Sequence, residues 1–119
     1  MKDVPPGLPL LIYDGDCNFC KRWIARWQKL TGQRVIYRPF QEVENHFAEI
    51  PRSAFEASVQ LIEPGGRILS GADAVFHTLE YARPKPKILS LRKLPGFMPL
   101  ARLAYKSVAR HRSFFSRFS

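Results

Sequence analysis

The fold is decided by residues 10–20, which read LLIYDGDCNFC and join an apolar run to a glycine turn and a pair of cysteines. The short apolar run after Pro9 is typical of a buried strand. Cys17 and Cys20, the two cysteines of the chain, open a helix-like stretch. Free N–H groups and partial positive charge at a helix N-terminus stabilise a thiolate there. The second thiol, three positions on, is placed to attack a mixed disulfide formed on the first.

The composition bounds the class of protein. A chain of 119 residues, 45% hydrophobic and 13% aromatic, fits one folded domain with a modest core. Two cysteines are too few for a secreted disulfide scaffold. The Pro-rich residues 1–9 lack the apolar core of a signal peptide, and no stretch approaches the length of a transmembrane segment. We therefore expect a cytoplasmic protein, in which a Cys-x-x-Cys pair is redox-active or metal-binding.

The net charge of +9 is unevenly distributed along the chain. Residues 1–83 balance ten Lys and Arg against ten Asp and Glu, whereas residues 84–119 hold nine Lys and Arg and no acid. This asymmetry predicts a redox domain over residues 1–83. A basic linker and helix over residues 84–119 follow it, and we expect that tail to dock on the same domain.

The hydrophobic periodicity predicts alternating strands and helices along the chain. The expected elements are a strand 10–13, a helix 17–30 capped by Gly32, a strand 34–37, a helix 41–50, a hairpin of strands 58–63 and 67–69, a helix 70–82 and a helix 96–111. The order β-α-β-α-β-β-α plus an extra helix is that of the α/β thioredoxin-like fold, with a mixed four-stranded sheet. For the last helix we expect an apolar side that includes Leu100, Leu103, Ala104 and Val108.

Residues 13–20 resemble the signature of the DCC family, which is named for an Asp-x-x-Cys-x-x-Cys motif. Its members are regarded as thiol-disulfide oxidoreductases of thioredoxin-like fold, and the likeness extends to residues 59–74 and 94–112. The resemblance implies that Cys17 is the nucleophile, Cys20 the resolving thiol and Asp14 the motif acid. Thioredoxins place a cis-proline just before the third strand, whereas residues 56–59 contain no proline. We therefore expect a different substrate-binding edge.

Charged residues surround the predicted nucleophile. Asp14 and Asp16 flank Cys17 and disfavour its thiolate, and Lys21 offsets part of that effect. We therefore expect moderate activation, which favours a reductant over a strong oxidant. Asp14 has two open roles, because its carboxylate can relay a proton to Cys20 or accept backbone hydrogen bonds in the Asp-Gly turn.

Other readings of the same residues stay open at this point. A Cys-x-x-Cys pair can be two core residues on one helix face. A structural zinc site needs four ligands, and the three histidines, at positions 46, 77 and 111, do not pair at finger-like spacing, so we expect no metal. Phe19 is a candidate for substrate contact or for burial, and Trp23 and Trp27 for the core or a substrate groove.

The expected function is that of a thiol-disulfide oxidoreductase, similar to a protein-disulfide reductase, with a Cys17/Cys20 couple and no bound cofactor. Its partners would be a disulfide-containing protein or small thiol substrate and an external thiol reductant. The alternative is a thioredoxin-like binding module whose dithiol is a redox switch. In that case the basic tail would hold an anionic partner, such as nucleic acid or an anionic membrane.

Overall fold

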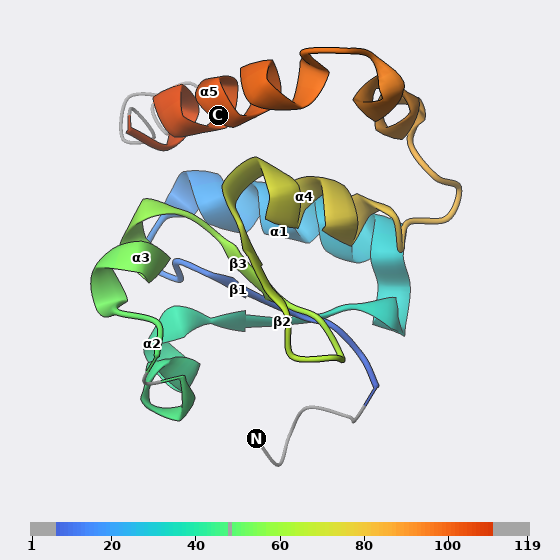
Figure 1. Cartoon of the computed structure of the whole chain (residues 1–119). Helices are drawn as coiled ribbons and strands as arrows, with labels where there is room; N and C mark the ends of the chain where they lie inside the picture. Colours follow the sequence, from blue (N-terminus) through green and yellow to red (C-terminus); the bar gives the residue numbers. More distant parts are fainter. Residues whose placement is uncertain (1–6, 48, 111–119) are drawn as a thin grey trace.

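The computed structural model describes residues 7–47 and 49–110, which form a sheet covered by helices on both faces (Figure 1). The strands are β1 (Leu10–Tyr13), β2 (Ile36–Pro39), β3 (Gln60–Ile62) and β4 (Ile68–Ser70), in the order β2-β1-β3-β4. β1 pairs in parallel with β2 and antiparallel with β3, which forms an antiparallel hairpin with β4. The predicted mixed four-stranded sheet and α/β fold class are confirmed.

Five α-helices and three 3-10 turns connect the strands of the described chain. The helices are α1 (Asn18–Thr31), α2 (Phe40–Val43), α3 (Arg52–Ala57), α4 (Gly71–Leu79) and α5 (Phe97–Arg110). The 3-10 turns are η1 (Gly32–Arg34), η2 (Glu44–His46) and η3 (Lys87–Lys93). Gly32 ends α1 with a φ of 59°, as expected of a glycine cap.

The predicted helix over residues 41–50 is wrong in its second half, because the helical segment ends at His46. The chain forms the short α2 and η2 there, and α3, which the sequence did not predict, begins after Pro51. Proline disfavours helix in the residue before it and presets φ for the helix after it, so Pro51 separates the two segments. The predicted strand 34–37 starts two residues late, at Ile36, because η1 adds a turn after α1.

β1 is apolar on both sides because both faces of the sheet are covered. Leu11 is fully buried under α1 and α4, in a cluster with Ile24 and Ala74. Leu10 and Ile12 point to the opposite face, where they are buried in a cluster with residues of α2 and α3. The strand that leads into the cysteine motif is therefore held from both sides.

α5 forms an additional layer over α1 and α4, on the side away from the sheet (Figure 1). The rings of Phe97 and Phe76 meet edge to face at 5.7 Å between centroids. Arg102 donates two hydrogen bonds of 3.0 Å to the carboxylate of Asp73 in the first turn of α4. These contacts attach the basic helix to the domain, while the predicted division of the chain at residue 83 stays a prediction.

The predicted apolar side of the last helix is wrong in its main members. Leu100 and Leu103 are 68% and 64% exposed, and Ala104 is also exposed. The docked face is formed instead by Phe97, Ala101 and Tyr105, which recur at four-residue spacing. Apolar residues lie on more than one side of this helix, and the aromatic side chains fill the space above α4.

No helix within the described parts of the chain is long and apolar enough to cross a membrane.

The Asp73–Arg102 contact makes the stability of the fold depend on pH. The hydrogen bonds from Arg102 lower the pKa of Asp73 in the folded protein. Because the unfolded chain then binds the proton more readily, this contribution is complete above the ordinary aspartate pKa of about 4 and is lost as the pH falls through the lower folded value. We expect Asp73→Asn to remove this part of the acid-induced loss of stability, measured by urea unfolding at a series of pH values.

An exposed carboxylate provides the matched control for this variant. Glu49→Gln changes the same charge at an exposed position away from α5, and the acid limb of its stability profile should follow that of the parent chain. If Asp73→Asn and the parent chain have the same acid limb, the Asp73–Arg102 contact does not stabilise the fold.

Candidate active site

Cys17 is the N-cap residue of α1, and its own sulfur caps the helix. The Cys20 N–H donates to the Cys17 Sγ over 3.2 Å, and the Lys21 N–H donates to the Cys17 carbonyl over 3.0 Å. The first turn of α1 contains no acidic residue. The sulfur therefore lies at the positive end of the helix dipole, beside the first N–H groups of α1.

Cys17 and Cys20 are present as thiols rather than as a disulfide, and both are half-buried. They lie one helical turn apart on α1, so the structure brings the predicted pair together at the end of β1. Their partial exposure distinguishes them from two core cysteines, which would be sealed among apolar side chains.

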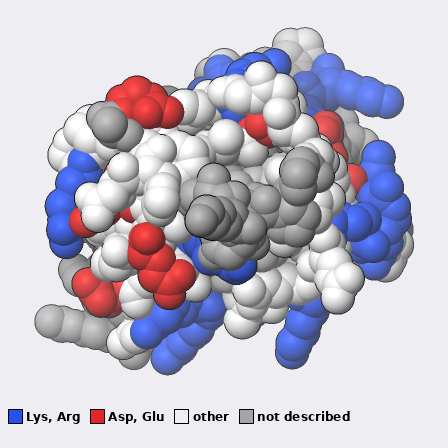
Figure 2. All heavy atoms as spheres, turned by 90° about the horizontal axis from the view of Figure 1, so that it is seen from below, with Lys and Arg blue, Asp and Glu red and all other residues white. Residues whose placement is uncertain are grey.

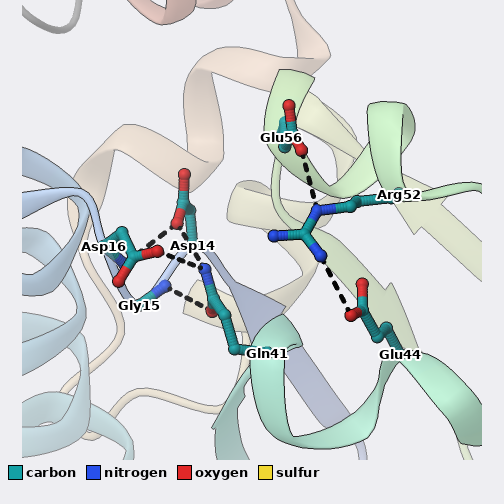
Figure 3. A network of polar contacts seen from close by, with 7 residues as sticks. All are labelled: Asp14, Gly15, Asp16, Gln41, Glu44, Arg52 and Glu56. Carbon is teal, nitrogen blue, oxygen red and sulfur yellow. Dashed lines mark hydrogen bonds and ion pairs between the residues drawn. The ribbon is translucent and has the colours of Figure 1, made fainter.

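Gln41, from α2, clamps the turn that precedes the cysteines (Figure 3). Its Nε2 donates to Asp14 Oδ1 over 2.9 Å and to Asp16 Oδ2 over 3.3 Å, while its Oε1 accepts from the Gly15 N–H over 3.0 Å. The same Asp14 oxygen accepts from the Asp16 N–H over 2.9 Å. One amide side chain therefore fixes three consecutive residues just before Cys17.

These contacts assign positions to both motif carboxylates. Asp14 accepts hydrogen bonds inside its turn, which is the structural alternative left open for it by the sequence. Asp16 does not cap α1, since Cys17 occupies that position. Gln41 was not predicted from the sequence, because it lies 27 positions from Asp14 and reaches it only through the parallel pairing of β1 and β2.

Gly15 is required by close packing against the end of β2. A Cβ at this position would lie 2.8 Å from the Cβ of Pro39 and 3.0 Å from the Oε1 of Gln41. Contacts under 3.0 Å are essentially absent between real side chains, so any larger residue displaces the turn. The glycine of the motif allows the cysteine turn to lie directly against β2.

The neighbouring elements hold this clamp in place. Arg52 on α3 donates to Glu44 over 3.2 Å and to Glu56 over 3.1 Å, as Figure 3 shows, and it stacks over the ring of Phe40. These ion pairs are exposed, so each contributes little to stability.

Burial raises the pKa of Tyr13, which ends β1, and the nearby carboxylate of Glu42 raises it further. Its phenol therefore stays neutral beside the turn.

An apolar groove of about 480 Å³ opens beside the second cysteine, between α1 and α5. Its lining includes Cys20, Phe19, Trp23 and Trp27 from α1 and Val108 from α5. Phe19 is half-buried and meets Trp23 edge to face at 6.2 Å, so it belongs to the groove wall. Trp23 is 40% exposed. Lys21 is exposed and is not part of the lining.

Val59 lies immediately before β3 and forms another part of the groove wall. Its N–H donates to the hydroxyl of Tyr105 on α5 over 3.0 Å. Thioredoxins have a cis-proline at this position, just before the third strand, whereas this chain has Val59. The different substrate-binding edge expected from this change stays a prediction. A cis peptide bond joins Arg83 to Pro84 instead, well after this strand. The sequence did not reveal that α5 contacts this edge.

The two described histidines, His46 and His77, join no group with the cysteines that could hold a metal ion. His77 Nδ1 lies 3.4 Å from Glu63 and 3.9 Å from Glu80, His46 is exposed, and His111 is outside the described residues. Among residues 7–47 and 49–110, no group of three or more His, Cys, Asp and Glu side chains is arranged to hold a metal ion.

The mixed sheet with a Cys-x-x-Cys pair at the start of the first helix defines a protein of thioredoxin-like fold with a dithiol site. Residues 11–118 match the family described as DCC1-like thiol-disulfide oxidoreductase. The chain belongs to this family, as the motif at residues 13–20 indicated. Neither the curated proteins nor the solved structures gave a match.

The packing at Gly15 generates a stability prediction. We expect Gly15→Ala to lower the free energy of unfolding by about 1–3 kcal/mol, because the new methyl group collides with Pro39 and Gln41. Gly65→Ala, in the turn between β3 and β4, is the matched control, since a Cβ there meets nothing within 4 Å. Urea unfolding of the two variants measures the difference, and equal stabilities would contradict the close packing.

Proposed function

We propose that this protein is a protein-disulfide reductase that acts through a Cys17/Cys20 dithiol-disulfide couple. The observation that carries the proposal is the position of the Cys17 sulfur at the N-cap of α1, where it accepts the Cys20 N–H. A half-buried sulfur at a helix N-terminus can be reached by a substrate disulfide. Membership of a thiol-disulfide oxidoreductase family supports the same class of reaction.

The proposed reaction has two exchange steps. The Cys17 thiolate attacks one sulfur of a substrate disulfide, which forms a mixed disulfide and releases the other substrate sulfur as a thiolate that takes a proton from water. The Cys20 thiolate then attacks the Cys17 sulfur and releases the second substrate thiolate. Two electrons pass from the dithiol to the substrate, and a Cys17–Cys20 disulfide is left.

The charges near the motif favour the reducing direction. Asp14 and Asp16 lie on the turn beside Cys17 and oppose its negative charge, whereas Lys21 places a positive charge within one turn of it. Negative charge beside the dithiol disfavours the reduced protein relative to its disulfide, which favours the role of a reductant over that of a strong oxidant. We place the reaction in the cytoplasm, where an external thiol returns the disulfide to the dithiol.

We assign Asp14 a positioning role. Its Oδ1 accepts from the Asp16 N–H and from Gln41, so the carboxylate holds the turn on which Cys17 stands. This assignment takes the structural alternative for Asp14 over the proton relay to Cys20.

The groove is proposed to bind apolar residues of the substrate polypeptide next to its disulfide. Cys20 lines the groove, so a substrate joined to Cys17 as a mixed disulfide lies beside it. The wall presents aromatic rings of α1, among them Phe19 and Trp23, and aliphatic carbons of α5. An apolar side chain gains from burial there, whereas a charged one loses hydration.

The two cysteines should differ in what their loss does. We expect Cys17→Ser to reduce the rate of insulin-disulfide reduction by at least about a hundredfold, because the nucleophile is removed. Cys20→Ser should instead accumulate a mixed disulfide through Cys17, visible as a reducible adduct on non-reducing gels and by mass.

The double variant Cys17→Ser/Cys20→Ser serves as the control for reaction at other groups and should form no adduct. A binding module with a redox switch would show no reductase turnover even before substitution. An adduct that forms on Cys20 rather than on Cys17 would overturn the assignment of the nucleophile.

The groove should set the affinity for polypeptide substrates. We expect Trp23→Ala to raise the KM for a peptide disulfide with aromatic neighbours by about fivefold, with a smaller change in kcat, because the lost contact is made equally in the bound and transition states. Lys29→Ala, an exposed change on the same helix outside the groove, is the control. Equal KM values for both variants would show that the groove does not contact the substrate.

A further inference from the structure

The outward face of α5 exposes large aliphatic side chains. Leu100 and Leu103 are 68% and 64% exposed, and Leu94, just before the helix, is 56% exposed. Leu100 and Leu103 stand three positions apart and so share one side of the helix. That side is opposite Phe97, Ala101 and Tyr105, which pack on the domain. A surface helix ordinarily presents polar side chains to water, so these leucines require an explanation.

The same surface is strongly basic. Between residues 84 and 110 there are seven Lys and Arg and no Asp or Glu. Lys106 stands three positions after Leu103 and Arg110 four positions after Lys106; both are exposed and lie along the leucine side of α5. Arg102 is engaged by Asp73 and Arg92 by Glu80, so neither is counted with them. The face seen from below in Figure 2, away from α5, instead shows acidic and basic side chains side by side.

We propose that the outward face of α5, with Leu94, binds the surface of an anionic membrane. The helix has 14 residues, which gives a length of about 21 Å, and it lies flat with its leucines in the outer acyl region and its basic residues among the headgroups. The exposed positive charges of Lys106 and Arg110 are complementary to anionic lipid. Binding is peripheral, since no described helix can cross the bilayer.

The leucines favour lipid over nucleic acid as the partner. Basic side chains alone fit either polyanion, because phosphate contacts supply most of the affinity for nucleic acid. Leucine, however, offers neither a hydrogen bond nor an aromatic plane to a base, and between residues 94 and 103 it supplies the exposed large side chains. In a membrane interface the same side chains leave water, and their burial adds to the electrostatic attraction.

Membrane binding is compatible with the fold and would orient the dithiol. The face of α5 that packs on α4 is opposite the leucines, so no contact of the domain has to break. The groove beside Cys20 is formed partly by α5 itself, through Ala104 and Val108. Ala104 stands four positions after Leu100, so the groove opens next to the leucine side of α5. The bound protein would meet disulfides close to the membrane.

Sedimentation of the full chain with vesicles tests the proposal. One vesicle type consists of phosphatidylcholine, and the other contains phosphatidylserine as well. We expect the partition coefficient to be at least about tenfold higher for the anionic vesicles, and to fall as salt is raised. Equal binding to both types, or no binding to either, would overturn the proposal.

Substitutions separate the apolar from the electrostatic contribution. Leu100→Ser/Leu103→Ser should weaken partitioning at least about tenfold, because two aliphatic side chains no longer enter the interface. Ile68→Ser, at an exposed aliphatic position on β4, is the control and should leave partitioning unchanged. Lys106→Glu/Arg110→Glu should abolish the preference for anionic vesicles, whereas Arg22→Glu/Lys29→Glu on α1 should retain most of it.

Two further measurements separate a loss of lipid binding from misfolding and from a failure of the reductase proposal. The leucine variant should retain its helical circular dichroism and its insulin reduction in solution, since both leucines are exposed and outside the groove. Vesicle binding should be the same in Cys17→Ser, so a failure of the reductase proposal does not affect this test. Undiminished vesicle binding by the leucine variant, or capture of a DNA or RNA duplex without capture by vesicles, would refute a lipid-binding face on α5.

Discussion

The parallel register of β1 and β2, which sets Tyr13 opposite Pro39, is the constraint on which the site depends. Because both strands run the same way, the chain that leaves each of them emerges at the same edge of the sheet. The turn at Gly15 then meets Pro39 and Gln41 at distances that only a glycine tolerates. The start of α1, and with it the sulfur of Cys17, is positioned by this contact rather than by the helix alone.

The parts of the fold that were predictable from the sequence are those with local causes. The strand Leu10–Tyr13 was predicted with its observed bounds, because a short apolar run between a proline and a glycine turn has few other solutions. Gly32 ends α1, and the Pro-Gly-Gly turn joins β3 to β4, where the backbone chemistry of these residues requires it. The cysteine pair lies at the start of α1 because the glycine turn after β1 leads directly into this helix.

The parts that were not predictable depend on partners far away in the chain. Gln41 reads as an ordinary polar residue until the sheet brings it against Asp14. α5 has apolar residues around much of its circumference, so periodicity could not choose a face. The face of α5 that packs on the domain is determined by aromatic rings that pack on α4, such as Phe97 on Phe76, and by the hydrogen bonds from Arg102 to Asp73. The hydrogen bond from Val59 to the hydroxyl of Tyr105 could not be predicted either, because the two residues are 46 positions apart.

The hydrogen bond between Tyr105 and Val59 has a practical consequence for anyone who trims this chain to its thioredoxin-like part. A fragment that stops before α5 would keep both sulfurs and the glycine turn, yet it would leave the amide at the start of β3 without its hydroxyl acceptor. It would also lack the wall of the groove that α5 forms next to Cys20. Reaction rates measured on such a fragment would describe the two cysteines without the α5 wall of the groove, which is proposed to contact the substrate.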